Sequence, residues 1–126
     1  MSLRTDRVRA VGLLRYRPGV TNEEAKANGP RLVETIKSIP IIQKNLLKYE
    51  LTFKTERLGT TLASDLGLQE ADTGVMVVVE AETHEKIREA LTSPEYRKII
   101  AGALENATSM DKYHWFSAEF MTVIDK

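Results

Sequence analysis

One apolar run limits the folds open to this chain more than any other feature. Residues Gly74 to Glu80 read Gly-Val-Met-Val-Val-Val-Glu. The run is too short to span a membrane, and its β-branched valines favour a strand over a helix. Alternate side chains are apolar on both faces, with Val75 and Val77 on one face and Met76 on the other. A strand of this kind is typical of a sheet that is covered on both sides.

Composition excludes several classes of protein. The chain has 126 residues, and we expect a single domain spanning residues 1–126. Its 18 basic and 18 acidic residues cancel without forming a basic face, which argues against binding to nucleic acid. The chain has no cysteine, so disulfides and thiolate catalysis are excluded. Because no apolar run is long enough for a signal peptide or a membrane span, we expect a soluble, cytoplasmic protein.

The hydrophobic pattern predicts six elements in the order strand, helix, strand, strand, helix, strand. We expect strands over residues 7–16, 44–55, 74–80 and 112–124, and helices over residues 21–38 and 84–104, the second restarting at residue 93. Thr21, Thr83 and Ser93 are placed to cap these helices, with a turn at residues 17–19. Two right-handed βαβ crossovers in one sheet predict an α+β, ferredoxin-like βαββαβ sandwich with a four-stranded antiparallel sheet.

Two segments interrupt this pattern. Asn28-Gly29-Pro30 lies inside the first helix, where proline removes a hydrogen bond and glycine adds a cost of ~1 kcal/mol. Such a triplet indicates either a break in the helix or a use for the space that it opens. The connection over residues 56–72 contains a short helical piece, and connections of this length are often functional or mobile. The sequence does not decide whether it is a lid.

The valine strand also predicts self-association. Met76 and Val78, together with Val11 and Leu13 of the first strand, would be bare in a single copy with helices on one face only. A two-fold homodimer that packs sheet against sheet would cover them.

Several stretches taken together resemble a known family. Residues 14–21, the Asn28-Gly29-Pro30 triplet, the valine strand and Ser93-Pro94-Glu95-Tyr96 with its helix resemble the EthD-like branch of the dimeric α/β-barrel superfamily. The similarity extends from about Val8 to Thr122, and residues 48–72 look most like fungal members. The resemblance implies a homodimer whose sheets form a barrel, with a small apolar pocket between sheet and helices. It also implies cofactor-free chemistry, since relatives include cyclases, dehydratases, decarboxylases, isomerases and small monooxygenases.

This chain departs from these relatives at two positions. Many EthD-like chains have His-Gly-Pro where this chain has Asn28-Gly29-Pro30. Related cyclases often have histidine two residues past the proline of the second helix, where this chain has Tyr96. Both usual histidines are therefore absent from these positions.

Three residues remain as candidates for catalysis. His114 shares strand parity with Phe116, so we expect it to face the helices, either as a general base or as a hydrogen-bonded core residue. Tyr96 would hydrogen-bond a substrate carbonyl and stabilise an enolate, or else fill the core as a helix-stripe aromatic. Asn28 would donate to a carbonyl or simply cap a helix break. His84, the other histidine, is expected in solvent, and the pair lacks metal-ligand spacing, so no metal site is predicted.

The leading hypothesis is a cofactor-independent lyase or isomerase acting on a small apolar aromatic or polyketide-like substrate. Gly12 and Gly29 would hollow the space between the sheet and the first helix. The expected substrate-binding residues are Gly12, Leu14, Tyr16, Gly29, Leu32, Tyr49, Val75, Val77 and Phe116. A non-catalytic ligand-binding or stress-associated dimer, and a cofactor-free monooxygenase, remain as alternatives.

Overall fold

The structure, a computed structural model, describes residues 2–16, 19–55 and 61–126, and the side chains of these residues except 61 and 103–112. Residues 17–18 of the turn and residues 56–60 of the long connection, both discussed above, lie outside this range. The elements in chain order are β1 (Val8–Tyr16), α1 (Asn22–Lys37), α2 (Pro40–Asn45), β2 (Leu46–Phe53), α3 (Thr61–Asp65), β3 (Val75–Ala81), α4 (His84–Leu91), α5 (Pro94–Ala107) and β4 (Thr108–Ala118).

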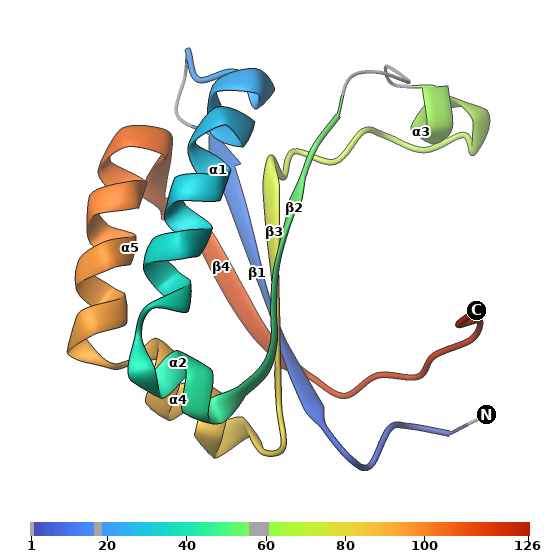
Figure 1. Ribbon diagram of the computed structural model, residues 1–126. Helices are drawn as coiled ribbons and strands as arrows, with labels where there is room; N and C mark the ends of the chain where they lie inside the picture. The colour runs from blue at the N-terminus through green and yellow to red at the C-terminus, as the bar shows by residue number, and fades with distance from the viewer. Residues whose placement is uncertain (1, 17–18, 56–60) are drawn as a thin grey trace.

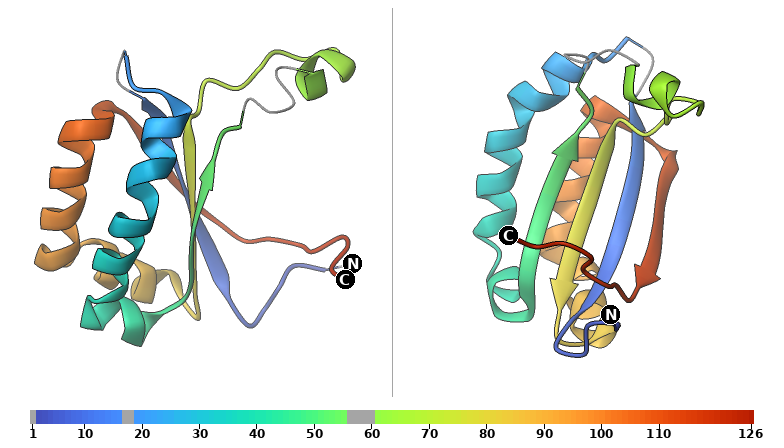
Figure 2. Two further views of the ribbon diagram at one scale, coloured as in Figure 1. Left: turned by 45° about the horizontal axis from the view of Figure 1, so that its top comes forward. Right: turned by 90° about the vertical axis from the view of Figure 1, so that its right-hand side faces the viewer.

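The strands form one antiparallel four-stranded sheet in the order β2-β3-β1-β4. Helices α1, α2, α4 and α5 lie together on one face of it, and α3 lies apart, on the side of the other face (Figures 1 and 2). This order and layering are those expected of a βαββαβ sandwich, so the α+β fold and the antiparallel sheet are confirmed. No helix within the described ranges is long and apolar enough to cross a membrane.

The predicted helix caps are confirmed. The backbone N–H of Glu24 donates to Thr21 Oγ1 at 3.1 Å, and that of Lys86 donates to Thr83 Oγ1 at 3.2 Å. Ser93 Oγ accepts from the N–H of Tyr96 at 3.3 Å. Each hydroxyl satisfies a donor that has no partner within its own helix.

One open alternative is decided, and two predicted strands have the wrong bounds. Helix α1 continues through Pro30, so the Asn28-Gly29-Pro30 triplet does not break the helix. Residues 40–45 form helix α2, with Pro40 in the first turn, where the missing N–H of proline costs nothing; strand β2 therefore starts at Leu46 rather than at residue 44. Strand β4 spans residues 108–118, and residues 119–126 follow it outside the sheet.

The core lies between the sheet and the helices. Val77 and Val79 of β3 pack with Ala10 and Leu14 of β1 and with Ile87 of α4. A second cluster joins the helices to one another and consists of Ile36, Ile39, Ile42, Ala90 and Tyr96. Val75, Val77 and Val79 thus point toward the helical layer, as the alternation of the valine strand requires.

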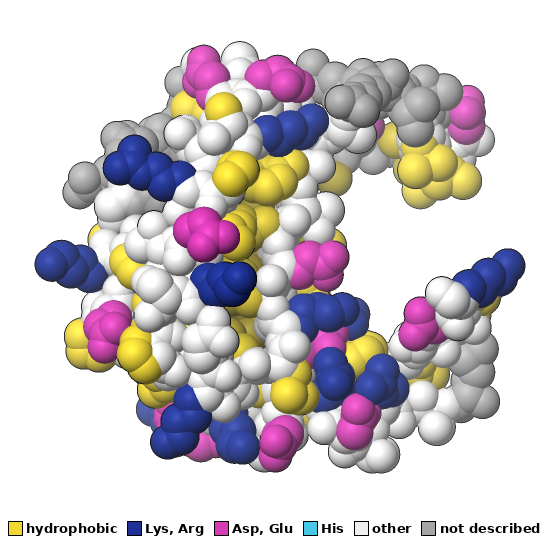
Figure 3. Space-filling model, in the orientation of Figure 1, with side chains coloured by type: hydrophobic (Ala, Val, Ile, Leu, Met, Phe, Trp, Pro, Cys, Tyr) yellow, Lys and Arg dark blue, Asp and Glu magenta, His cyan; other side chains and the backbone are white. Residues whose placement is uncertain are grey.

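The opposite face of the sheet, called the open face below, carries no helix of the described chain (Figure 2). The expectation that Val78 would be bare there is wrong, since it is only 7% exposed; Val11, Leu13 and Met76 are partly buried, and Phe116 is 53% exposed. Figure 3 shows a hollow on this side, with an apolar patch on the α3 segment at one end and the two chain termini at the other. The exposed apolar side chains at the two ends of this hollow are Leu62, Leu66 and Leu68 in and after α3 and Met121, Val123 and Ile124 near the C-terminus.

A buried carboxylate also lies on the open face. The side chain of Glu80 is 2% exposed and accepts hydrogen bonds from Arg9 Nε at 2.9 Å and from Arg7 at 3.1 Å. Phe120 covers this group, because the Arg9 guanidinium lies 3.8 Å from the centre of its ring. Burial alone would raise the pKa of Glu80, but the bonds from Arg9 and Arg7 outweigh it and lower that pKa.

Candidate functional site

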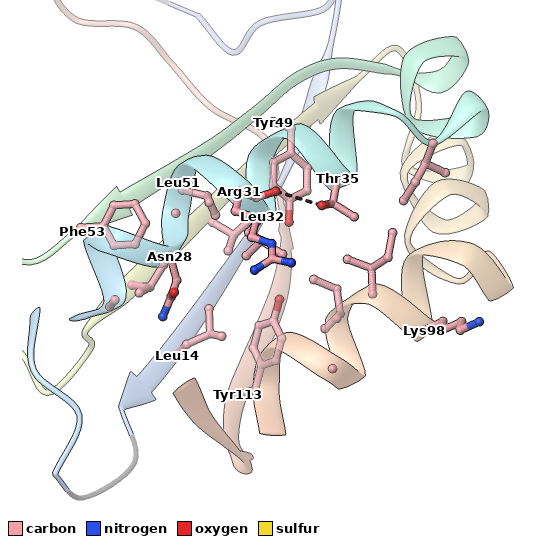
Figure 4. A pocket seen from close by; sticks show the side chains of 18 of the residues that line it. Leu14, Asn28, Arg31, Leu32, Thr35, Tyr49, Leu51, Phe53, Lys98 and Tyr113 are labelled. Atoms are coloured by element: carbon pink, nitrogen blue, oxygen red, sulfur yellow. Dashed lines mark hydrogen bonds between the residues drawn. The ribbon is translucent and has the colours of Figure 1, made fainter. Parts of the chain in front are cut away.

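A cavity of about 970 Å³ lies between the sheet and helices α1 and α5 (Figure 4). All four strands contribute to its wall, and α1 and α5 form its two sides. The lining residues are Leu14, Tyr16, Ala25, Asn28, Gly29, Arg31, Leu32, Thr35, Ser38, Ile39, Tyr49, Leu51, Phe53, Val75, Val77, Glu95, Lys98, Ile99, Ile100, Gly102 and Tyr113. A volume of this size is at the upper end of those found for small-molecule sites.

The floor of the cavity is apolar because alternate strand residues point toward the helices. Leu14 of β1, Leu51 and Phe53 of β2, and Val75 and Val77 of β3 supply it. These residues occupy paired positions on neighbouring strands, with Leu14 opposite Val75 and Leu51 opposite Val77. An apolar floor of this kind binds hydrocarbon surface and excludes water from polar groups placed beside it.

Three tyrosines meet at the back of the cavity. The hydroxyls of Tyr49 and Tyr96 lie 2.8 Å apart, and their rings pack edge to face with centres 6.2 Å apart. The phenol of Tyr113 interacts with that of Tyr96, and its ring packs beside Trp115 with centres 5.6 Å apart. Tyr49 and Tyr113 line the cavity, while Tyr96 is 4% exposed and lies behind them.

Burial raises the pKa of all three phenols above the ordinary tyrosine value. Desolvation raises the pKa of Tyr49, and in Tyr96 it does so together with the neighbouring phenols. Burial likewise raises the pKa of Tyr113 to about 12. All three side chains are therefore neutral at physiological pH and can donate a hydrogen bond. Two of them, Tyr49 and Tyr113, line the cavity.

The rim of the cavity is polar and exposed. Helix α1 contributes Asn28, Arg31 and Thr35, and helix α5 contributes Glu95 and Lys98. Thr35 Oγ1 donates to the backbone carbonyl of Arg31 at 2.9 Å, as Figure 4 shows. In that view Arg31 lies over the opening between the two helices, with its guanidinium toward the Tyr113 side.

Two glycines allow aromatic rings to pack directly against the backbone at one end of the cavity. A Cβ built on Gly29 would lie 3.0 Å from the tip of the Phe53 ring, so the glycine of the α1 triplet serves close packing rather than a helix break. A Cβ on Gly74 would lie 2.6 Å from the Tyr16 ring. The Tyr16 hydroxyl donates to the Gly74 carbonyl at 2.9 Å, which fixes that ring at the edge of the cavity.

Most, but not all, of the predicted site residues line the cavity. Those that line the cavity are Leu14, Tyr16, Asn28, Gly29, Leu32, Tyr49, Val75 and Val77. Tyr96 reaches it only through Tyr49 and Tyr113. Gly12 is not part of the lining, because the Trp115 ring fills the space beside it: a Cβ there would lie 2.6 Å from that ring. The expectation that Gly12 hollows the site is therefore wrong.

His114 and Phe116 lie on the other side of the sheet. In the β1–β4 pairing, cavity-lining Tyr113 is opposite Leu14, so His114 is opposite Leu13 and faces away from the helices. Both residues are exposed, and neither lines the cavity. The expected orientation of His114 is wrong because strand parity separates side chains into two sets without saying which set faces the helices.

Sequence reasoning missed several lining residues. In the sequence, Tyr113 stands out only as one of several aromatic residues in the last strand, and Leu51 and Phe53 only as alternating strand residues. The structure places all three in the cavity wall. Arg31, Glu95 and Lys98 carried no signal, because a charged residue on a helix is usually solvated. Their common position at one opening depends on how α1 and α5 pack side by side.

Comparisons with known proteins identify the fold. No protein-family model and no curated protein matches the sequence. Solved structures do match: a dimeric protein with a ferredoxin-like fold from Bacteroides fragilis has a TM-score of 0.64 at 15% identity, over 94% of this chain and 100% of that one. An EthD family protein from Bacillus halodurans has a TM-score of 0.59 at 16% identity, over 91% and 99%.

A hydroxynitrile lyase from Passiflora edulis has a TM-score of 0.61 at 8% identity, over 97% of this chain and 100% of that one. At such identities the likeness shows the fold alone. This chain therefore has a ferredoxin-like α+β fold with a cavity between its sheet and its helices.

Proposed function

We propose that the cavity binds a small, largely apolar molecule with a carbonyl group, of aromatic or polyketide type, and that the protein is a cofactor-independent lyase or isomerase. The observation that carries this proposal is the pair of neutral phenols, Tyr49 and Tyr113, in an otherwise apolar wall. Protonated phenols aimed into a low-dielectric cavity stabilise an oxyanion as it develops on a carbonyl. Aldol-type cyclisation, dehydration of a β-hydroxy ketone and decarboxylation of a β-keto acid all pass through such an enolate.

The proposed roles follow from position. Tyr49 and Tyr113 contact the carbonyl oxygen, and Asn28 at the rim supplies a further amide donor. Tyr96 is a positioning residue: when it donates its proton to Tyr49, the Tyr49 proton is directed to the cavity. His114, on the other face, has no part in this arrangement.

The base must come from another residue. Among the described residues that line the cavity, Glu95 is the one carboxylate, and none is a histidine. We assign to Glu95 the removal of a proton from the carbon next to the substrate carbonyl. The Passiflora edulis lyase supports the wider proposal, because it shows that this fold accommodates a lyase.

A second candidate is a ligand-binding protein without turnover. It is favoured by the lack of an imidazole among the described lining residues, since imidazole is the side chain that titrates near neutral pH. A cofactor-free monooxygenase is a weaker candidate and predicts consumption of oxygen. We also retain the proposal that the chain is an EthD-like member of fungal type. The fold of the Bacillus halodurans protein supports the wider superfamily, and the fungal type rests on the sequence resemblance alone.

The test is turnover of a panel of aromatic and polyketide-like ketones without added cofactor, with and without oxygen. The Tyr49→Phe variant is expected to lower kcat by about 10²-fold, the effect of one lost oxyanion donor. Glu95→Gln should abolish proton exchange at the substrate carbon, as followed by deuterium uptake. Binding without turnover or proton exchange would instead establish the ligand-binding candidate.

We further propose that the protein is a homodimer joined through its open face, in which two sheets form a barrel. The apolar Val11, Leu13 and Met76, on a sheet face that no described helix covers, support this. The hollow bounded by α3 and the termini has the concave shape that a second copy would occupy (Figure 3). The Bacteroides fragilis neighbour is itself described as dimeric.

A further inference from the structure

The opening of the cavity carries more positive than negative charge. Arg31 from α1 and Lys98 from α5 line it from opposite sides, and Glu95 is the one acidic side chain among the described lining residues. One positive charge is therefore left uncompensated at the entrance to an apolar space. A neutral ketone would make no use of that charge.

Neither cation is held by a partner among the described residues. Within the described part of the chain, the side chains of Arg31 and Lys98 form no ion pair or hydrogen bond, although other exposed cations do, such as Lys86 with Glu82 at 3.4 Å. An unpaired cation is not unusual on a surface: Arg97, one residue from Lys98, is also exposed and has no ion pair with any described side chain. What sets Arg31 apart is its position, because it lies over the cavity whereas Arg97 does not line it (Figure 4).

We propose that Arg31 holds the negatively charged head of the ligand, so that the substrate is an amphiphilic organic acid with a carboxylate at the mouth and its apolar body on the cavity floor. This inference rests on the proposed function of the cavity and specifies its substrate class. The planar guanidinium of Arg31 presents parallel N–H donors that match the two oxygens of a carboxylate. The single excess charge at the mouth suits a monoanion better than a dianionic phosphate.

The position of the head group orients the rest of the ligand. Apolar atoms beyond a carboxylate at the mouth would lie against Leu14, Leu51 and Val77. The Tyr49 and Tyr113 hydroxyls would then meet a second polar group part-way along the molecule. A keto acid, with its ketone some atoms from its carboxylate, satisfies both sets of contacts.

The experiment compares acids with their neutral esters. Decanoate and naphthylacetate, each with its methyl ester, are titrated into the full-length protein by calorimetry at low ionic strength. The wild-type protein is expected to bind each acid at least about 10-fold more tightly than its ester, as a charge-assisted contact predicts. This preference should shrink in high salt, because the site at the mouth is exposed to screening.

Variants locate the effect. Arg31→Ala should remove most of the preference for the acid while leaving the affinity for the ester unchanged, and Arg31→Lys should restore part of it. Arg97→Ala is the matched control and should behave as the wild type. Far-ultraviolet circular dichroism verifies that each variant is folded.

Two results would overturn the inference. If acid and ester bind equally to the wild type, or if Arg31→Ala and Arg97→Ala lower the acid affinity alike, the mouth does not select anions, although the cavity still binds apolar molecules as proposed. If neither acids nor esters bind to the folded protein, the inference and the proposed function fail together.

Discussion

The Tyr49 hydroxyl of strand β2 lies 2.8 Å from the Tyr96 hydroxyl of helix α5, and this contact joins the sheet to the helical layer at the back of the cavity. Burial raises the pKa of both phenols, so both stay uncharged well into the alkaline range. The hydrogen bond between these two hydroxyls therefore stabilises the fold, and it also orients the Tyr49 hydroxyl, which is the proposed donor to the substrate.

Removing either hydroxyl should weaken the protein by about 1–2 kcal/mol, because the remaining phenol loses its hydrogen-bond partner. Tyr49→Phe and Tyr96→Phe should together cost less than the sum of the single variants, as measured by urea unfolding and a double-mutant cycle. Tyr16→Phe is the comparison, since Tyr16 bonds the Gly74 carbonyl instead and should add to Tyr96→Phe without coupling. Strict additivity of the Tyr49 and Tyr96 variants would contradict the pairing.

Alkaline pH should unfold the protein through the same tyrosines. Their folded pKa values lie above the ordinary value near 10, with that of Tyr113 at about 12. Their contribution to stability is thus complete below pH ~10 and is lost as pH rises from there toward the folded values, at up to about 1.4 kcal/mol per pH unit for each group. Tyrosinate absorbance should appear together with unfolding, and Tyr96→Phe should flatten the decline. Tyrosinate formation in the folded protein near pH 10 by all these groups would disprove it.

Gly12→Ala should destabilise the protein by about 1–3 kcal/mol, because the new methyl group would overlap the Trp115 ring. Gly102→Ala is the control, since open space surrounds that position in helix α5 and alanine favours a helix by ~1 kcal/mol. The two variants should therefore change the free energy of unfolding in opposite directions. The tryptophan emission of Gly12→Ala should also shift, as Trp115 is the sole tryptophan of the chain.

Glu80→Gln should cost about 1–3 kcal/mol at neutral pH, because Arg7 and Arg9 lose a charged acceptor that is almost wholly buried. The pKa of Glu80 is lowered in the fold, so its contribution is complete above the ordinary value and disappears as pH falls through the lowered one. The wild type and the variant should thus converge in acid. Glu82→Gln, at an exposed residue paired with Lys86, should change stability little at any pH.

Leu13→Lys should convert the proposed dimer to monomers, because it buries a charge against the apolar open face of a second copy. Sedimentation velocity at micromolar concentration measures the outcome. Val33→Lys introduces the same charge at a 41% exposed position on helix α1 and should leave the assembly unchanged. If the wild-type protein is a monomer under these conditions, the proposed dimeric barrel is wrong.

Much of the fold was accessible from the sequence because its signals are local. The alternation of residues 74–80 predicted β3, and Thr21, Thr83 and Ser93 predicted the helix starts. Helix α2 was missed because its six residues are too short for a helical period to be visible.

The site was less accessible because it depends on pairing and packing. The side of the sheet that His114 occupies follows from its register opposite Leu13, which no local pattern contains. The lining by Arg31, Lys98 and Tyr113 needs α1 and α5 to lie over the same part of the sheet. Gly12 was expected to hollow the site, and that was wrong because the Trp115 ring that fills the space comes from β4, about a hundred residues further along the chain.

The mouth between α1 and α5 and the open face lie on opposite sides of the sheet. In the proposed dimer, a second copy on the open face would therefore leave the entrance unobstructed, and a ligand could enter and leave without dissociation of the two copies. Ligand binding to one cavity should then give a hyperbolic isotherm without cooperativity. Dilution that separates the two copies should leave the Kd unchanged.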